Sequence, residues 1–224
     1  MYKIILFDLD GTLTDSSEGI CKSLQYALER IGRPVPELKE LECFIGPPLK
    51  TSFKLYQNLE GPEAERAIAF YRERYAKVGK FENKPYDGII ELLGKLKDAG
   101  YILAVATGKP ELYAGDIIEH FGMGEYFTEV VGGDLEGKRD RKEDVIREVL
   151  KRLSVTAEEA CECAVMIGDR HFDVEGAKAV GIDCIGVTFG FGNATELKEA
   201  GADYIADSVT ELWQLIVDKS RGMQ

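Results

Sequence analysis

The chain has 224 residues, more than one common domain and fewer than two, so a large domain that carries a smaller insert is expected. Its apolar share of 45% and charged share of 30% are ordinary for a folded globular protein. The net charge of -12 argues against a nucleic-acid polymer or an anionic membrane as partner, because both bind basic surfaces. A small anionic substrate would therefore need a local cation.

The cysteines and the amino-terminal residues indicate the cellular compartment of the protein. The five cysteines are scattered and contain no CxxC pair, which is typical of free thiols in a reducing compartment. The apolar run after Met1 is broken by Asp8 before a signal-peptide core forms, and no run reaches membrane-spanning length. We therefore predict a cytoplasmic protein.

Strand-like and helix-like segments alternate over most of the chain. Short β-branched or aromatic runs that predict buried strands occupy residues 3–7, 101–106, 127–131, 164–167, 184–187 and 204–206. Helical spacing of apolar residues predicts helices at 86–99, 111–121, 142–153, 173–180 and 209–217. This alternation predicts right-handed crossovers and a parallel sheet covered on both faces, a Rossmann-like three-layer α/β core.

Residues 16–84 interrupt the alternation. Helical patterns cover 16–31 and 62–78, and no strand pattern is evident between them. Residues 16–85 carry 12 Lys and Arg against 10 Glu and no Asp, so this segment is mildly basic within an acidic chain. We predict a small α-helical cap domain at 16–84, inserted into a catalytic core formed by 1–15 and 85–224.

The first predicted strand ends in two aspartates, Asp8 and Asp10, followed by Gly11 and Thr12. Ligands of open α/β sheets gather outside the carboxyl ends of strands, so two carboxylates at such an end are placed for chemistry. Asp-Gly is also a common turn pair, which is the structural alternative. A turn does not require a second aspartate at the same strand end.

Two further strand ends supply matching groups. Thr107 and Gly108 offer a hydroxyl and a backbone amide near the start of the next helix, a favourable place for an anion. Asp169 and Asp173 follow the strand at 164–167, with a spacing that suits one metal ligand and one supporting carboxylate. All of these side chains are expected at one edge of the sheet.

In this order the motifs resemble the haloacid dehalogenase-like hydrolase superfamily, in the branch whose helical cap directly follows the first motif (C1 position). The resemblance covers essentially the whole chain. It implies a phosphomonoester hydrolase in which Asp8 is the nucleophile and Asp10 the general acid and base. It also implies Mg²⁺ as cofactor, held by Asp8, the backbone carbonyl of Asp10 and Asp169, with Asp173 bound to it indirectly.

The resemblance assigns phosphate binding to Thr107, the Gly108 amide and a lysine. Lys142, at the start of the helix 142–153, best matches the pattern, and Lys138 is the alternative. In the cap, the segment Phe44–Lys50 contains a Pro-Pro pair that could bring Lys50 to the substrate or simply connect two helices. No role is assigned to Arg170, and His171 is expected to be an ordinary loop histidine.

The substrate is predicted only as a class. The FIGPPL, GDR and GFG stretches are similar to phosphoglycolate phosphatases and 5′-nucleotidases, so a small phosphorylated metabolite is expected. A phosphosugar mutase of the β-phosphoglucomutase type would share every motif, and a phospho-accepting regulator without turnover is an alternative outside the enzymes. The sequence leaves open whether the chain is a monomer or a homodimer.

Overall fold

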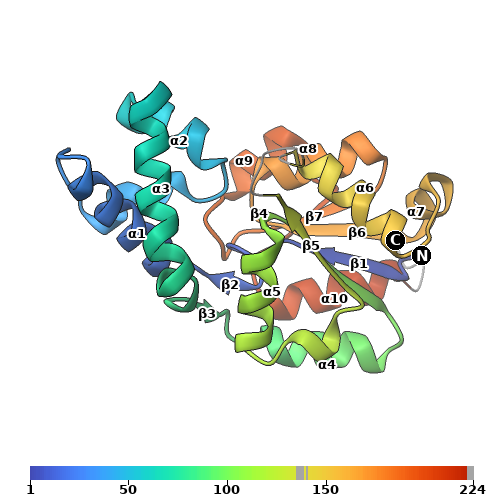
Figure 1. Cartoon of the computed structure of the whole chain (residues 1–224). Coiled ribbons are helices and arrows are strands. Elements are labelled where there is room, and N and C mark those ends of the chain that lie inside the picture. Colours follow the sequence, from blue (N-terminus) through green and yellow to red (C-terminus); the bar gives the residue numbers. More distant parts are fainter. Residues whose placement is uncertain (135–138, 140, 221–224) are drawn as a thin grey trace. The chain divides into compact units, whose positions relative to one another are not determined.

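The computed structural model describes residues 1–134, 139 and 141–220, which form two compact units (Figure 1). One unit comprises Met1–Thr14 and Pro85–Gln224, and the other comprises Asp15–Lys84. The chain passes between them at β2 (Thr14–Asp15) and β3 (Lys84–Pro85), which pair as a two-stranded sheet. The roles of catalytic core and cap for these units remain predictions.

The larger unit is built on a parallel sheet. Within the described residues six strands lie in the order β5-β4-β1-β6-β7-β8, and each neighbouring pair is parallel. The strands are β1 (Ile4–Phe7), β4 (Ile102–Pro110), β5 (Glu129–Gly133), β6 (Ala164–Gly168), β7 (Asp183–Val187) and β8 (Tyr204–Ala206). The strand order reverses around β1, and such a switch point is where open α/β sheets bind ligands.

Helices cover both faces of this sheet. One face packs against α4 (Ile89–Asp98), α5 (Glu111–His120) and α10 (Val209–Ser220), and the other against α6 (Lys142–Arg152), α7 (Ala157–Cys163), α8 (His171–Val180) and α9 (Ala194–Ala200). Among the described residues, no helix is both long and apolar enough to cross a membrane. The predicted three-layer α/β fold is confirmed.

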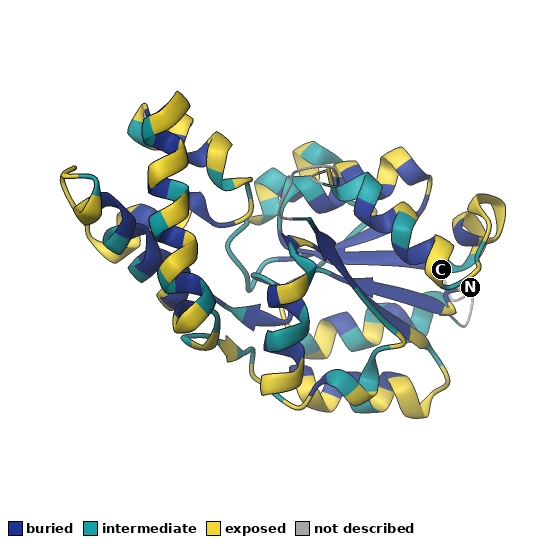
Figure 2. Cartoon of the chain, in the orientation of Figure 1, coloured by how far each residue is buried: buried dark blue, intermediate teal, exposed yellow. Residues whose placement is uncertain are grey.

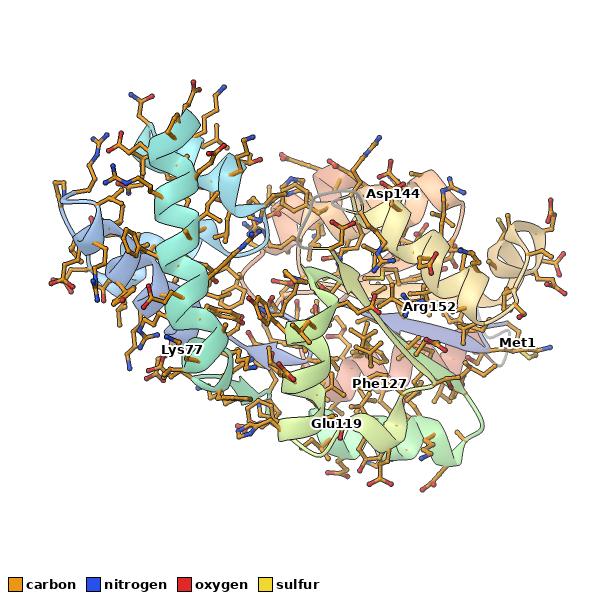
Figure 3. The ribbon with its side chains drawn as sticks, in the orientation of Figure 1. Met1, Lys77, Glu119, Phe127, Asp144 and Arg152 are labelled. Carbon is orange, nitrogen blue, oxygen red and sulfur yellow. The ribbon has the colours of Figure 1, made fainter. Side chains whose placement is uncertain are left out.

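Alternation along β1 explains the two cores. Ile5 and Phe7 join the α4, α5 and α10 layer, whereas Ile4 and Leu6 join the layer of α6 to α9, because successive strand residues point to opposite faces. Phe7 packs edge-on against Phe127, with ring centroids 6.3 Å apart (Phe127 is labelled in Figure 3). The central strands β1 and β6 are buried along their whole length, and most of the sheet is dark blue in Figure 2.

Strand β4 differs from the sequence prediction because it continues to Pro110. The extra residues cross a shift in register against β5 between Ala106 and Pro110. Thr107 and Lys109 therefore both belong to the strand, and α5 begins only at Glu111. The sequence analysis also missed α7 and α9, which are short helices whose starts are set by side-chain caps from Thr156 and Asn193.

The smaller unit is helical, with α1 (Ser17–Arg30), α2 (Leu49–Gln57), α3 (Gly61–Lys77) and two 3₁₀ turns, η1 (Leu38–Phe44) and η2 (Gly79–Phe81). Phe44 is buried and packs edge-on against Phe53, with ring centroids 5.4 Å apart, and also contacts Tyr56. Phe44 therefore belongs to this unit's own core, and the segment after it connects η1 to α2. Lys50 is exposed on α2.

Candidate active site

The carboxyl ends of β1 and β6 bring two aspartates to one edge of the sheet. The Asp8 amide donates a hydrogen bond of 2.9 Å to the carbonyl of Ile167, so Asp8 continues the parallel pairing of β1 with β6. Asp169 follows Gly168, the last residue of β6. Because parallel strands end at the same edge, the two carboxylates that the sequence separates by 161 positions become neighbours.

Asp173, on the first turn of α8, completes a buried acidic cluster with Asp8 and Asp169. Carboxylate oxygens of the three residues all lie within 4.8 Å of one another. Burial, and then the charges of Asp173 and Asp8, hold the pKa of Asp169 well above its ordinary range. Burial also raises the pKa of Asp173, opposed by Lys142 and supported by Asp8. The cluster therefore holds more negative charge than its own surroundings stabilise.

Lys142, the first residue of α6, is the cation that faces this cluster. Its Nζ lies 3.0 Å from Asp8 Oδ1 and 2.7 Å from Asp173 Oδ1, and it donates a 3.0 Å hydrogen bond to the carbonyl of Ala106. Burial lowers the pKa of Lys142, but the two carboxylates outweigh burial and raise it above its ordinary value. Lys142 is therefore charged and joins β1, β4 and α8, whereas Lys138 lies outside the described residues.

Backbone amides fix the orientation of the two most buried carboxylates. Asp169 Oδ2 accepts a 2.8 Å hydrogen bond from the Phe191 amide, and the Thr12 hydroxyl donates to Oδ1 at 3.4 Å. Asp173 Oδ2 accepts from the Arg170 amide at 3.1 Å, as part of the cap of α8. Each of these carboxylates thus has one oxygen held by the main chain, which limits its rotation.

Glycines allow the loops to close around Asp169. Gly11 has a φ of +84°, and a Cβ there would lie 2.2 Å from Asp169 Oδ2. A Cβ on Gly190, in the loop after β7, would lie 2.1 Å from the Gly11 carbonyl oxygen and 2.6 Å from Asp169 Cβ. The Gly190-Phe191-Gly192 stretch noted in the sequence therefore has a definite place, since it supports Asp169 directly.

Thr107 and Gly108 lie on the end of β4, beside β1. Thr107 is buried, and its hydroxyl oxygen accepts a 3.2 Å hydrogen bond from the Lys109 amide, which leaves the hydroxyl proton to be donated elsewhere. Gly108 is exposed, and a Cβ built on it would meet no atom within 4 Å, so its backbone is open to a ligand. This geometry suits the phosphate-binding role that the sequence predicts for both residues.

Asp10 makes an ion pair that the sequence analysis missed. Its Oδ2 lies 2.8 Å from Lys109 Nζ, and the two side chains are only 14% and 5% exposed. Lys109 directly follows Gly108 in the sequence, and the sequence analysis gave it no role. Continuing the strand's alternation past Thr107 would have found it, because residues two apart on a strand share a face.

Arg170 and His171 have partners outside this cluster, and Lys50 belongs to the smaller unit. Arg170 Nε and His171 Nδ1 lie 2.9 Å and 2.7 Å from the same Glu196 oxygen, so both residues tie α8 to α9. This explains them without a catalytic role. Lys50 belongs to the other unit, and its contact with substrate remains a prediction.

The acidic cluster has the donor set for a hard divalent cation. Among the described residues, the cluster has three carboxylates and one ion-paired ammonium group, so full ionisation would leave an excess of two formal negative charges within it. Asp8 Oδ1 and Asp173 Oδ1 are ion-paired with Lys142, yet neither forms a hydrogen bond of good angle within the described part of the chain. Mg²⁺ prefers oxygen ligands such as carboxylates, so the three aspartates of the cluster fit such an ion.

The parallel sheet with acidic strand ends and a facing lysine defines an α/β protein with an acidic site at the sheet edge, and comparison with known proteins identifies its family. Residues 5–187 match the family model of haloacid dehalogenase-like hydrolases, and the chain belongs to this family. The sequence predictions of the family, of the enzyme class and of phosphatase relatives are confirmed.

The chain is 42% identical over 215 residues to a 5′-nucleotidase of Pseudomonas aeruginosa, covering 96% of each protein. It is 39% identical to the tyrosine-protein kinase PtkA of Mycobacterium tuberculosis, covering 93% of this chain and 69% of that protein. More distant relatives, at 25–28% identity, are named phosphoglycolate phosphatase. The crystal structure of a predicted phosphatase from Clostridium acetobutylicum is 49% identical, with a TM-score of 0.92 over 97% of this chain and 99% of that one.

The glycine loop, residues 190–192, supports Asp169, and Gly190→Ala tests this support. The new Cβ would collide with the Gly11 carbonyl and with Asp169, so we expect Mg²⁺ affinity to fall by about 10–100-fold, as is usual when a ligand loses its support. Calorimetric titration with Mg²⁺ measures this directly.

Gly115→Ala is the matched control. Gly115 lies inside α5, and a Cβ there meets nothing within 4 Å. Alanine at an interior helix position should keep Mg²⁺ binding and raise the free energy of unfolding by up to about 1 kcal/mol. If Gly190→Ala binds Mg²⁺ as the unmodified protein does, the glycine loop has no part in positioning Asp169.

Proposed function

We propose that the protein is a Mg²⁺-dependent phosphatase that hydrolyses a small phosphomonoester through an aspartyl-phosphate on Asp8. The observation that carries the proposal is the buried arrangement of Asp8 against Lys142 and two further aspartates at the sheet edge. Phosphoryl transfer depends mainly on positioning and charge compensation, and this edge supplies both.

In the first step the Asp8 carboxylate attacks phosphorus, and the bond from phosphorus to the leaving oxygen breaks. Asp10 gives its proton to that oxygen, so the product leaves as a neutral alcohol. In the second step Asp10 takes a proton from water, whose oxygen attacks the phosphorus of the acyl phosphate. Inorganic phosphate leaves, and the Asp8 carboxylate is restored.

The remaining residues hold the transferring group. The Thr107 hydroxyl and the Gly108 amide would donate to phosphate oxygens, and Lys142 would offset their negative charge. Mg²⁺, held by Asp8, the Asp10 carbonyl and Asp169 with Asp173 in support, would neutralise charge between nucleophile and phosphate. Lys50 would contact the organic part of the substrate from the smaller unit.

Among possible substrates, nucleoside 5′-monophosphates are favoured over phosphoglycolate. The relative named 5′-nucleotidase shares 42% of its residues with this chain, whereas those named phosphoglycolate phosphatase share 25–28%. We place the reaction in the cytoplasm, in agreement with five free cysteines. The oligomeric state is proposed as monomer or homodimer.

Phosphate release from a panel of phosphomonoesters tests this substrate class. We expect kcat/KM to be highest for a nucleoside 5′-monophosphate, lower for phosphoglycolate and lower again for sugar phosphates. A ranking led by isomerisation of a phosphosugar, primed by its bisphosphate, would instead identify a mutase. Stable phosphorylation without phosphate release would identify a regulator.

Asp8→Asn tests the nucleophile. Asparagine keeps the shape of the side chain but cannot attack phosphorus, so we expect kcat to fall by at least about 10⁴-fold, the scale seen when a nucleophile is lost. The fold should survive, because one of three crowded carboxylates is neutralised while Lys142 keeps Asp173 and the Ala106 carbonyl. Steady-state assay and thermal unfolding measure the two effects. Near-normal turnover would remove Asp8 from this role.

Removal of the metal tests the cofactor. Activity should disappear in excess chelator and return on addition of Mg²⁺, and Asp169→Ala should weaken Mg²⁺ binding in a calorimetric titration. Lys95→Ala is a suitable control, because Lys95 pairs with Glu91 on the surface of α4. This variant keeps the acidic cluster intact and should bind Mg²⁺ normally. Full activity in excess chelator is incompatible with the proposed cofactor.

A further inference from the structure

The pair of Lys109 and Asp10 is held more tightly than an ordinary surface ion pair. Lys109 Nζ lies 2.8 Å from Asp10 Oδ2, and neither side chain is more than 14% exposed. The Lys109 amide also donates to the Thr107 hydroxyl at 3.2 Å. The lysine is thus fixed both at its backbone and at its charged end, so it holds Asp10 in a defined position.

The other oxygen of Asp10 is in an unusual state. Oδ1 is fully buried, and within the described residues it has no hydrogen-bond partner. A buried carboxylate oxygen without a partner is costly, so it calls for an explanation such as a catalytic role. The two oxygens are therefore not equivalent, because Lys109 binds Oδ2 whereas Oδ1 has no hydrogen-bond partner among the described residues.

We infer that Lys109 is a positioning residue for proton transfer by Asp10. Its ammonium group holds Oδ2, so that Oδ1 gives the proton to the leaving oxygen in the first step and takes one from water in the second. Lys109 itself keeps its protons throughout. This inference rests on the proposed function, because it assumes that Asp10 is the general acid and base.

The dependence of rate on the leaving group separates this role from simple support of the fold. An alkyl leaving group, as in adenosine 5′-monophosphate, needs a proton as it departs, whereas p-nitrophenolate does not. Lys109→Met should lower kcat/KM for adenosine 5′-monophosphate by roughly 10²-fold, the scale for a catalytic group displaced by about 1 Å. The loss for p-nitrophenyl phosphate should be much smaller. A residue that only stabilised the fold would lower both rates equally.

The double variant tests whether Lys109 acts through Asp10. If it does, adding Lys109→Met to Asp10→Asn should cause no further loss with adenosine 5′-monophosphate, because the group that Lys109 positions is already disabled.

Lys109→Arg keeps the charge with a different shape, and it should recover part of the loss. It also serves as the test variant if removal of the buried charge prevents Lys109→Met from folding. Lys95→Met, at the surface pair with Glu91, is the control for loss of a lysine and should match the unmodified enzyme with both substrates.

Two results would overturn the inference: an equal loss with both substrates, or losses that multiply in the double variant. Asp10→Asn alone distinguishes a failure of the proposed function from a failure of the inference about Lys109. If that variant loses mainly the alkyl substrate while the Lys109 variants do not, the proposed function stands and the inference about Lys109 is wrong. If Asp10→Asn affects both substrates equally, the role of Asp10 falls, and the inference falls with it.

Discussion

The site depends on one buried cation, the ammonium group of Lys142. It lies between Asp8 and Asp173 and donates to the Ala106 carbonyl, so it joins two strands and a helix at the sheet edge. Without it, the clustered carboxylates would repel one another in surroundings that stabilise charge poorly. Lys142 alone does not balance them, and the remaining negative charge makes the edge suited to a divalent cation and, through that cation, to a phosphate.

The surrounding loops serve this arrangement of charge. Gly11 and Gly190 allow the backbone to approach Asp169 closely, and Phe191 supplies the amide that holds it. A separate ion pair, between Asp10 and Lys109, lies at the same edge. The edge thus contains a cluster with excess negative charge, suited to metal and nucleophile, beside a neutral pair suited to proton transfer. This division of charge supports the proposed phosphoryl transfer.

The fold was predictable because it depends on patterns local to the sequence. Apolar runs ending at Gly or Asp gave the six strands, and helical spacing gave the longer helices. Some features escaped. The short helices α7 and α9 lack a full apolar stripe and depend on the caps from Thr156 and Asn193. The extension of β4 to Pro110 depends on pairing with β5 across a register shift, which is a property of two distant segments.

The candidate site was predictable in its acids and less so in its cations. The aspartates follow strand ends, whereas the carboxylate that a lysine pairs with, such as Asp10 for Lys109, depends on the folded structure even where strand alternation indicates the lysine's face. The most direct measurement of the central claim is peptide mapping by mass spectrometry after rapid quenching of the enzyme with substrate. The account predicts a transient phosphoryl group on Asp8 that hydroxylamine removes. Phosphate release with no phosphoryl group on Asp8 at any time, or a phosphoryl group on another residue, would contradict it.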